Sequence, residues 1–238
     1  MTADTAAVLV AAGQGRRMGG MNKALLRLGG RPVLEYSLQT LRECPSVGRI
    51  ILVMNDFDLE RLTAEWHTDP TALGIDEVVD GGPERWLSSQ NGCKAAAKSG
   101  LPYLLVHDAA RPLLQAEDLQ SVLAAARKSG AALAAEPLAD TLKQSCSDTR
   151  VQSTVPREGL WRAQTPQVAK SAWMLEAFSS WDTAVDGLPT DESMMLESIG
   201  HPPELVPCQG PNFKITLPRD LLLAEALMRD AAVVDFGS

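Results

Sequence analysis

The chain has 238 residues, of which 45% are hydrophobic, and it carries a formal charge of −8. This length and hydrophobic content allow a sizeable buried core, which excludes an intrinsically disordered chain. The acidic balance argues against a nucleic-acid partner, because such surfaces bind phosphates mostly through basic side chains.

Short apolar segments alternate with longer amphipathic segments. The apolar segments, which predict strands, are AAVLV (6–10), IILVM (50–54), IDEVV (75–79), YLLVH (103–107) and AALAA (131–135). Helix patterns lie between them at PVLEYSLQTLREC (32–44), DLERLTAEW (58–66), RWLSSQNGCKAAAKS (85–99) and DLQSVLAAARKSG (118–130). This alternation predicts an α/β fold, Rossmann-like, with a mostly parallel sheet and helices on both of its faces.

The later part of the chain differs in pattern. From about Asp140 to Gln167 the sequence turns polar and loses any helical period, which predicts a protruding β-arm. Beyond it we expect helices near Ser171–Ser179 and Asp191–Ile199, a strand in FKITL (213–217), and a helix from Pro218 to about Ala231. We therefore expect one domain over residues 1–238, with the arm at about 140–167 inserted in it.

The stretch AAGQGRRMGGMNK (11–23) follows the first expected strand. Gly13 and Gly15 allow backbone N–H groups to approach oxyanions, and Arg17 and Lys23 can help to surround a triphosphate. The pattern is not a dinucleotide fingerprint, because the third glycine is missing, and the chain has no Walker A motif. We interpret it as a phosphate-binding loop rather than as a turn with solvated arginines.

Two further loops follow expected strand ends. DGGPERWLSSQNG (80–92) contains the close-approach turn Gly81–Gly82 and the hydroxyl of Ser88, and VHDAARPLL (106–114) contains Asp108 and Arg111. A carboxylate beside phosphates repels them unless a divalent cation intervenes, so the sequence implies Mg²⁺. Ligands of open parallel sheets bind beyond the carboxyl ends of the strands, so these loops are expected to converge on one edge.

Several chemistries have no motif here. The sequence lacks a G-x-S-x-G elbow, an H-E-x-x-H motif and any Cys and His pairing, and its four cysteines are expected to be reduced thiols. Cations, glycines and few carboxylates suit phosphoryl or nucleotidyl transfer, in which positioning and charge stabilisation dominate. With no basic leader and no apolar run of about 18 to 20 residues, the chain is expected to be cytoplasmic and without a membrane partner.

Six motifs occur in order over nearly the whole chain: AAGQGRRMG, DGGPERWLSSQNG, VHDAARP, RAQTPQ, TDESMMLE and NFKIT. Together they resemble the 2-C-methyl-D-erythritol 4-phosphate cytidylyltransferases of the non-mevalonate isoprenoid pathway. The resemblance implies one nucleotidyltransferase domain that transfers CMP from CTP to the phosphate of methylerythritol phosphate, with Mg²⁺, and releases pyrophosphate. It also implies a homodimer whose arms exchange.

The resemblance assigns roles to particular residues. The catalytic cations would be Arg17, Lys23, Lys214 and Arg157, with Arg17 and Lys23 on the triphosphate. The nucleotide would be bound by Ala11, Ala12, Gly13, Gly15, Gly82, Ser88 and Asp108. The second substrate would be surrounded by Asp108, Arg111, Thr141, Arg157, Thr165, Thr190 and Lys214, and Asp108 would be the metal ligand. Without the resemblance, Arg157 could be a surface charge and Thr190 part of a helix cap.

The chain departs from this family at one place. Asn22-Lys23-Ala24 stands where the family usually has Pro-Lys-Gln, and the preceding loop is shorter by about one residue. The departure leaves open where Lys23 lies relative to the α-phosphate, and it motivates the alternative of a catalytically weak nucleotide-binding or scaffolding protein.

Two further enzyme classes stay open. A ribitol 5-phosphate cytidylyltransferase shares the first loop and the HD-x-x-RP pattern, although the two alanines of VHDAARP favour methylerythritol phosphate. An NAD-dependent oxidoreductase rests only on the incomplete glycine pattern.

Overall fold

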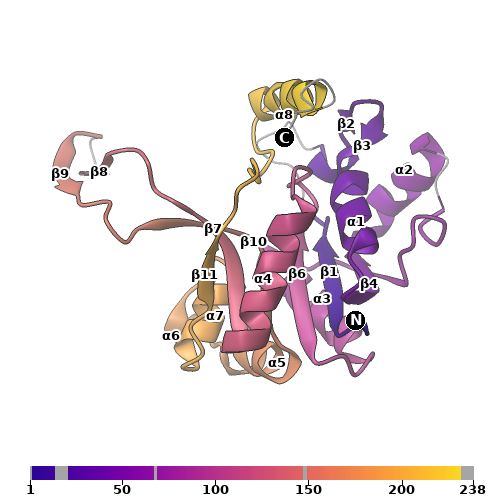
Figure 1. Ribbon diagram of the computed structural model, residues 1–238, viewed down its shortest axis with the longest axis horizontal. Helices are drawn as coiled ribbons and strands as arrows, with labels where there is room; N and C mark the ends of the chain where they lie inside the picture. The colour runs from indigo at the N-terminus through magenta and orange to yellow at the C-terminus, as the bar shows by residue number, and fades with distance from the viewer. Residues whose placement is uncertain (1, 14–20, 67–68, 147–148, 232–238) are drawn as a thin grey trace, which may run out of the picture.

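The computed structural model describes residues 2–13, 21–66, 69–146 and 149–231. Within them, one sheet has the strand order β11-β7-β10-β6-β1-β4-β5 (Figure 1). These strands are β1 (Thr5–Val10), β4 (Val47–Val53), β5 (Glu77–Val79), β6 (Tyr103–Asp108), β7 (Ala131–Pro137), β10 (Trp161–Lys170) and β11 (Glu204–Pro207). β10 is antiparallel to β6 and β7, whereas the other neighbours are parallel. The predicted mostly parallel α/β sheet is confirmed.

Helices cover both faces of this sheet, because successive strand side chains point to opposite faces. Ala7 and Leu9 of β1 pack in one buried cluster with α1 (Val33–Glu43), α2 (Asp56–Trp66) and α4 (Ala116–Ser129). Ala6 and Val8 pack in another with α3 (Arg85–Ala97), α5 (Ser171–Ser180) and α7 (Glu192–Ser198). In Figure 1, α4 lies in front of the sheet and α3 behind it. All of these helices were predicted from the sequence.

Several helix ends have the expected signals. α4 ends at Ser129 and is capped by Gly130, which has the left-handed φ of 94° that glycine adopts readily. α7 begins after Asp191, whose carboxylate accepts a 3.0 Å hydrogen bond from the Met194 backbone N–H. The remaining short elements are the 3-10 helix η2 (Lys23–Leu25), β2 (Arg27–Leu28), β3 (Arg31–Pro32) and α6 (Thr183–Asp186).

The arm is a hairpin of β8 (Leu142–Ser145) and β9 (Val151–Val155), which stands out from the body at the left of Figure 1. It is shorter than the expected span to Gln167, because β10 returns to the sheet. Gln167 is buried there, and its amide nitrogen donates to Asp191 at 3.0 Å while its oxygen accepts from the Ser193 backbone at 2.8 Å. The polar residue Gln167 therefore belongs to the buried sheet, where its amide is satisfied, and not to the exposed arm.

Two predictions near the C-terminus need correction. FKITL (213–217) is not a strand: Ile215 is buried in a small cluster with Leu28 and Val33, and its N–H donates to the carbonyl of Ala110. The alternation of apolar and polar residues in FKITL arises because Phe213 and Ile215 of this irregular segment pack against the same small cluster. The edge strand β11 was missed, because only Val206 of its four residues is buried. The final helix, α8 (Pro218–Ala231), begins and ends as predicted.

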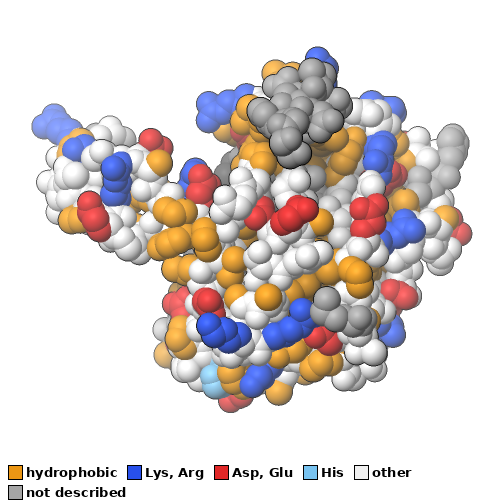
Figure 2. Space-filling view, viewed as in Figure 1, with side chains coloured by type: hydrophobic (Ala, Val, Ile, Leu, Met, Phe, Trp, Pro, Cys, Tyr) orange, Lys and Arg blue, Asp and Glu red, His pale blue; other side chains and the backbone are white. Residues whose placement is uncertain are grey.

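Charged side chains of both signs are spread over the face drawn in Figure 2, and no single basic patch dominates it. Among the described residues, no helix has both the length and the apolar character needed to cross a membrane.

Candidate active site

A cavity of about 330 Å³ opens at the carboxyl ends of β1 and β6. Eight residues predicted for the site line it: Ala11, Ala12, Gly13, Lys23, Gly82, Ser88, Asp108 and Lys214. The expected convergence of these loops on one edge is thus observed. Gly15 and Arg17, also predicted for the site, belong to residues 14–20 and lie outside the described residues.

Two glycine positions let the loops at this edge come close together. A Cβ atom on Gly81 would meet the Cβ of Ala12 at 2.2 Å, and one on Gly82 would meet the Cβ of Leu87 at 2.4 Å. Ser88 is buried, and its hydroxyl accepts a 3.0 Å hydrogen bond from the Gly82 N–H. The turn before α3 is therefore held against the residues that follow β1.

Gly81→Ala is expected to lower the free energy of unfolding by about 1–3 kcal/mol, because the added methyl group forces the two loops apart. Urea denaturation measures this change. Gly13→Ala is the matched control, because a Cβ there meets nothing within 4 Å. Equal stability of the two variants would show that the loops do not approach as described.

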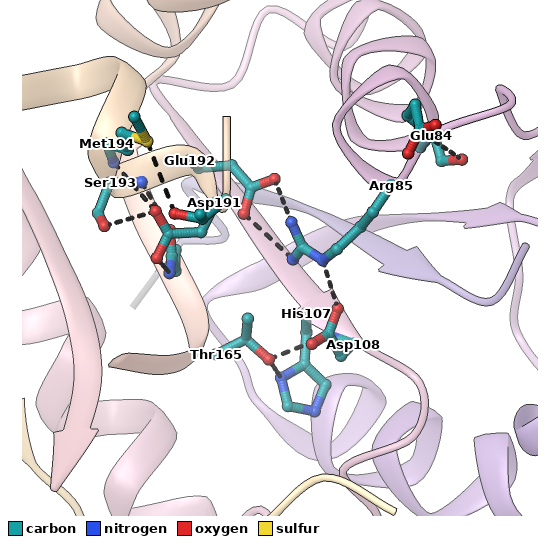
Figure 3. A network of polar contacts seen from close by, with 12 residues as sticks. Glu84, Arg85, His107, Asp108, Thr165, Asp191, Glu192, Ser193 and Met194 are labelled. Carbon is teal, nitrogen blue, oxygen red and sulfur yellow. Dashed lines mark hydrogen bonds and ion pairs between the residues drawn. The ribbon is translucent and has the colours of Figure 1, made fainter. Parts of the chain in front are cut away.

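Asp108, at the end of β6, has three basic side chains around it, of which Figure 3 shows Arg85. Arg85 Nε lies 2.9 Å from Oδ1, Lys214 Nζ lies 2.8 Å from Oδ2, and Arg111 Nε lies 3.7 Å from Oδ2. Burial opposes ionisation of Asp108, but the charges of Arg85, Lys214 and Arg111 outweigh burial and hold its pKa well below the usual range. Asp108 is thus an ionised carboxylate that fixes these cations at the cavity.

Arg85, whose side chain is 27% exposed at the cavity, forms an ion pair with the buried Glu192 that the sequence did not predict. The guanidinium nitrogens Nη1 and Nη2 lie 2.9 and 3.2 Å from the two carboxylate oxygens of Glu192, which is fully buried. Arg85 is the first residue of α3, where the helix dipole disfavours a cation. A basic residue at this unfavourable position was the one feature of the sequence that could have indicated a nearby carboxylate partner for Arg85.

Thr165 supports Asp108 from β10. Its hydroxyl accepts a 3.0 Å hydrogen bond from the Asp108 N–H and lies 3.0 Å from His107 Nδ1. Complete burial lowers the pKa of His107 to about 4, so the imidazole is neutral at pH 7. Arg111 donates from Nη1 to the carbonyl of Asn212 at 2.7 Å, which ties the segment before Lys214 to the end of β6.

Lys23 lies at the cavity as the first residue of η2. Asn22, in place of the family's proline, has φ of −66°, a value that proline also adopts. The substitution therefore keeps the backbone direction that leads into Lys23.

Three predicted substrate residues lie elsewhere. Thr141, just before β8, and Arg157, just after β9, are both exposed. The Arg157 guanidinium donates to the carbonyl of Ala139. Thr190 is exposed just before α7, where its hydroxyl lies 3.6 Å from the sulfur of Met194. None of the three lines the described cavity, and neither do Arg111 and Thr165, which contact Asp108 instead.

The described residues do not fit a magnesium ion held by the protein. Both oxygens of Asp108 already have basic partners, and within the described ranges no group of three or more His, Cys, Asp and Glu side chains could hold a metal ion. Asp108 as a metal ligand stays a prediction.

A mostly parallel sheet with lysines, an arginine and a glycine turn around a cavity at its strand ends is the arrangement of a phosphate-binding α/β enzyme, and the matching family model makes it a nucleotidyltransferase. The sequence profile described as 2-C-methyl-D-erythritol 4-phosphate cytidylyltransferase matches residues 5–230. The chain belongs to this family, a family of CTP-using cytidylyltransferases of isoprenoid precursor biosynthesis.

Individual relatives agree with this assignment. The 2-C-methyl-D-erythritol 4-phosphate cytidylyltransferase of Dehalococcoides mccartyi strain CBDB1 is 37% identical over 223 residues, covering 94% of this chain and 95% of that protein. The crystal structure of the cytidylyltransferase of the same name from Thermus thermophilus superimposes with a TM-score of 0.75 at 33% identity, covering 93% of this chain and 98% of the other. The 4-diphosphocytidyl-2C-methyl-D-erythritol synthase structure from Anaerococcus prevotii gives 0.79 at 27% identity, covering 95% and 99%.

Proposed function

We propose that the cavity at the ends of β1 and β6 is where CMP passes from CTP to the phosphate of 2-C-methyl-D-erythritol 4-phosphate. The observation that carries this proposal is that Lys23 and Lys214 line one cavity together with the glycine turn at Gly82. A triphosphate and a phosphate monoester are both anions and need cations at their binding site. Because the chain as a whole carries a charge of −8, those cations have to be gathered locally at this cavity.

The reaction needs positioning more than proton transfer. An oxygen of the acceptor phosphate attacks the α-phosphorus of CTP, and the bond to the bridging oxygen of the β-phosphate breaks, releasing pyrophosphate. The acceptor is mostly a dianion at pH 7, because its second pKa is about 6. No general base is required, so Arg17, Lys23 and Lys214 contribute by holding two repelling anions in line and by stabilising the charge at phosphorus.

The pH profile follows from this mechanism. We expect kcat/KM for the acceptor to rise tenfold per pH unit up to about pH 6 and then to level off, as the acceptor phosphate loses its second proton. Neutral His107, with a pKa of about 4, adds no step above that pH. Steady-state rates between pH 5 and pH 8 measure the profile. A further rise above pH 7 would indicate an enzyme base and contradict the mechanism.

We further propose a homodimer in which the arm of one protomer reaches the site of the other. Most of the hairpin is exposed, and Val151 on β9 has 62% of its surface accessible. Because Thr141 and Arg157 sit on this arm and do not line the cavity of their own chain, a twin copy is the economical way to bring them to substrate. A cytoplasmic location stays a prediction.

Arg157→Ala is expected to raise KM for the acceptor by about tenfold or more, with KM for CTP unchanged, because the arm cation is proposed to bind the acceptor phosphate. The matched control is Arg162→Ala at the base of the arm, where Arg162 Nη2 lies 2.6 Å from the exposed carboxylate of Glu136. If only KM for CTP moved, the proposed placement of the arm would be wrong.

A pyrophosphate-release assay tests the whole proposal. CTP, UTP and ATP are each paired with methylerythritol phosphate or ribitol 5-phosphate, with Mg²⁺ present or chelated. We expect release above background for CTP with methylerythritol phosphate. Equal or faster release with ribitol 5-phosphate would overturn the proposed acceptor, and background release with both acceptors despite CTP binding would overturn catalysis at this cavity.

A further inference from the structure

Asn22, the residue before Lys23, is buried, with only 5% of its surface exposed. Its side-chain amide makes three hydrogen bonds within the protein. Its Nδ2 donates to the carbonyl of Ala11 at 2.6 Å and to Asp58 Oδ2 at 2.7 Å. Its Oδ1 accepts from the Ala24 N–H at 3.0 Å. One buried amide therefore joins the segment after β1, the beginning of α2 and the first turn of η2.

Asp58 completes this contact from α2. It is 6% exposed, and the same oxygen that accepts from Asn22 also accepts from Asn55 Nδ2 at 2.8 Å. The Asp58 N–H donates in turn to Asn55 Oδ1 at 2.8 Å. We call Asn22, Asn55 and Asp58 the clasp. It links the segments that follow β1 and β4 to the residue that precedes Lys23.

Lys23 is bounded by buried residues on both sides. Asn22 is fixed by the clasp, while Ala24 and Leu25 are 2% and 5% exposed and pack into the main core cluster. Lys23, between them, is partly exposed and lines the cavity. The backbone from which the lysine side chain extends is thus fixed by polar contacts before it and apolar contacts after it.

We propose that Asn22 and Asp58 are positioning residues that hold Lys23 for catalysis, an inference that rests on the proposed role of Lys23 at the triphosphate. A cation aids phosphoryl transfer when it already stands where charge develops, and misplacement by about 1 Å can cost 10²-fold in rate. The clasp keeps that position by fixing the backbone on the N-terminal side of Lys23. Asn22 also lines the cavity, whereas Asp58 does not, so an effect of Asp58→Ala on kcat reports positioning without a direct substrate contact.

Asn22→Ala and Asp58→Ala are each expected to lower kcat by roughly 10- to 100-fold. KM for the acceptor is expected to stay within about twofold, because the acceptor's own cations are untouched. Asp58→Asn retains an acceptor oxygen for Asn22 and is expected to keep most of the turnover. Asn22→Ser, which preserves the cap on Ala24 but is too short to bridge to Asp58, is expected to behave like Asn22→Ala and serves if the alanine variant fails to fold.

A double-mutant cycle separates positioning from general stability. If the clasp acts through Lys23, adding Asn22→Ala to Lys23→Ala lowers kcat by less than about twofold, whatever the shift in Tm. A further tenfold loss in that background would overturn the proposal, as would wild-type kcat in both Asn22→Ala and Asn22→Ser. Failure of the proposed function gives a different result: Lys23→Ala alone would then retain normal turnover.

Discussion

Lys23→Ala is expected to lower turnover by about two orders of magnitude or more, in the range seen when one preorganised charge donor is removed. Lys23 lines the cavity at the start of η2, and its neighbours on both sides are buried, so the backbone that carries its ammonium is fixed. Arg17→Ala, in the segment outside the described residues, is expected to cause a loss of the same size. Single-turnover rates with saturating CTP and acceptor measure both.

The matched control is Lys94→Ala, because Lys94 is exposed on α3 and its ammonium lies 3.0 Å from Gln90 Oε1, away from the cavity lining. It removes the same charge from the chain and is expected to leave turnover unchanged. Near-normal turnover of both Lys23→Ala and Arg17→Ala would contradict the role assigned to the loop after β1.

Arg85→Met is expected to lower the free energy of unfolding by about 3–5 kcal/mol, which is large compared with most substitutions. Removing the guanidinium leaves the fully buried carboxylate of Glu192 without its partner and takes the 2.9 Å contact from Asp108 Oδ1. Denaturant unfolding at pH 7 measures the loss.

A second substitution tests the cause of that loss. Glu192→Gln removes the orphaned charge, so the Arg85→Met/Glu192→Gln double variant is expected to be more stable than Arg85→Met alone. Arg162→Met is the control, because Arg162 pairs with Glu136, both side chains are exposed, and such pairs contribute little. If the double variant were no more stable than Arg85→Met, the ion pair would not explain the effect.

Strands and helices with a clear hydrophobic period were predictable from the sequence. β1, β6 and β7 are buried on both faces, so they stand out as short apolar runs between amphipathic helices. β10 was not predictable in this way. Its buried residues include Gln164, Thr165 and Gln167, and the groups that satisfy Gln167 lie on α7 and just before it, 24 and 26 residues away in the chain.

The site was predictable where it follows from strand ends, and less so where it depends on distant pairs. Glycines and basic residues after β1, the glycine turn after β5 and Asp108 with Arg111 after β6 indicated a phosphate-binding edge, and that edge holds Lys23 and Asp108. The partners of Arg85 lie 23 and 107 residues further along the chain, and those of Asn22 include Asp58, 36 residues on. Such pairings arise only from the folded arrangement, so local spacing could not reveal them.

A crystal structure of the protein with CTP tests the central claim most directly, because it locates each phosphate relative to the cavity. We expect the triphosphate to lie beside Lys23 and Arg17, with the cytidine near Gly82 and Ser88. Phosphates bound outside this cavity, with Lys23 and Arg17 directed into bulk solvent, would contradict the account.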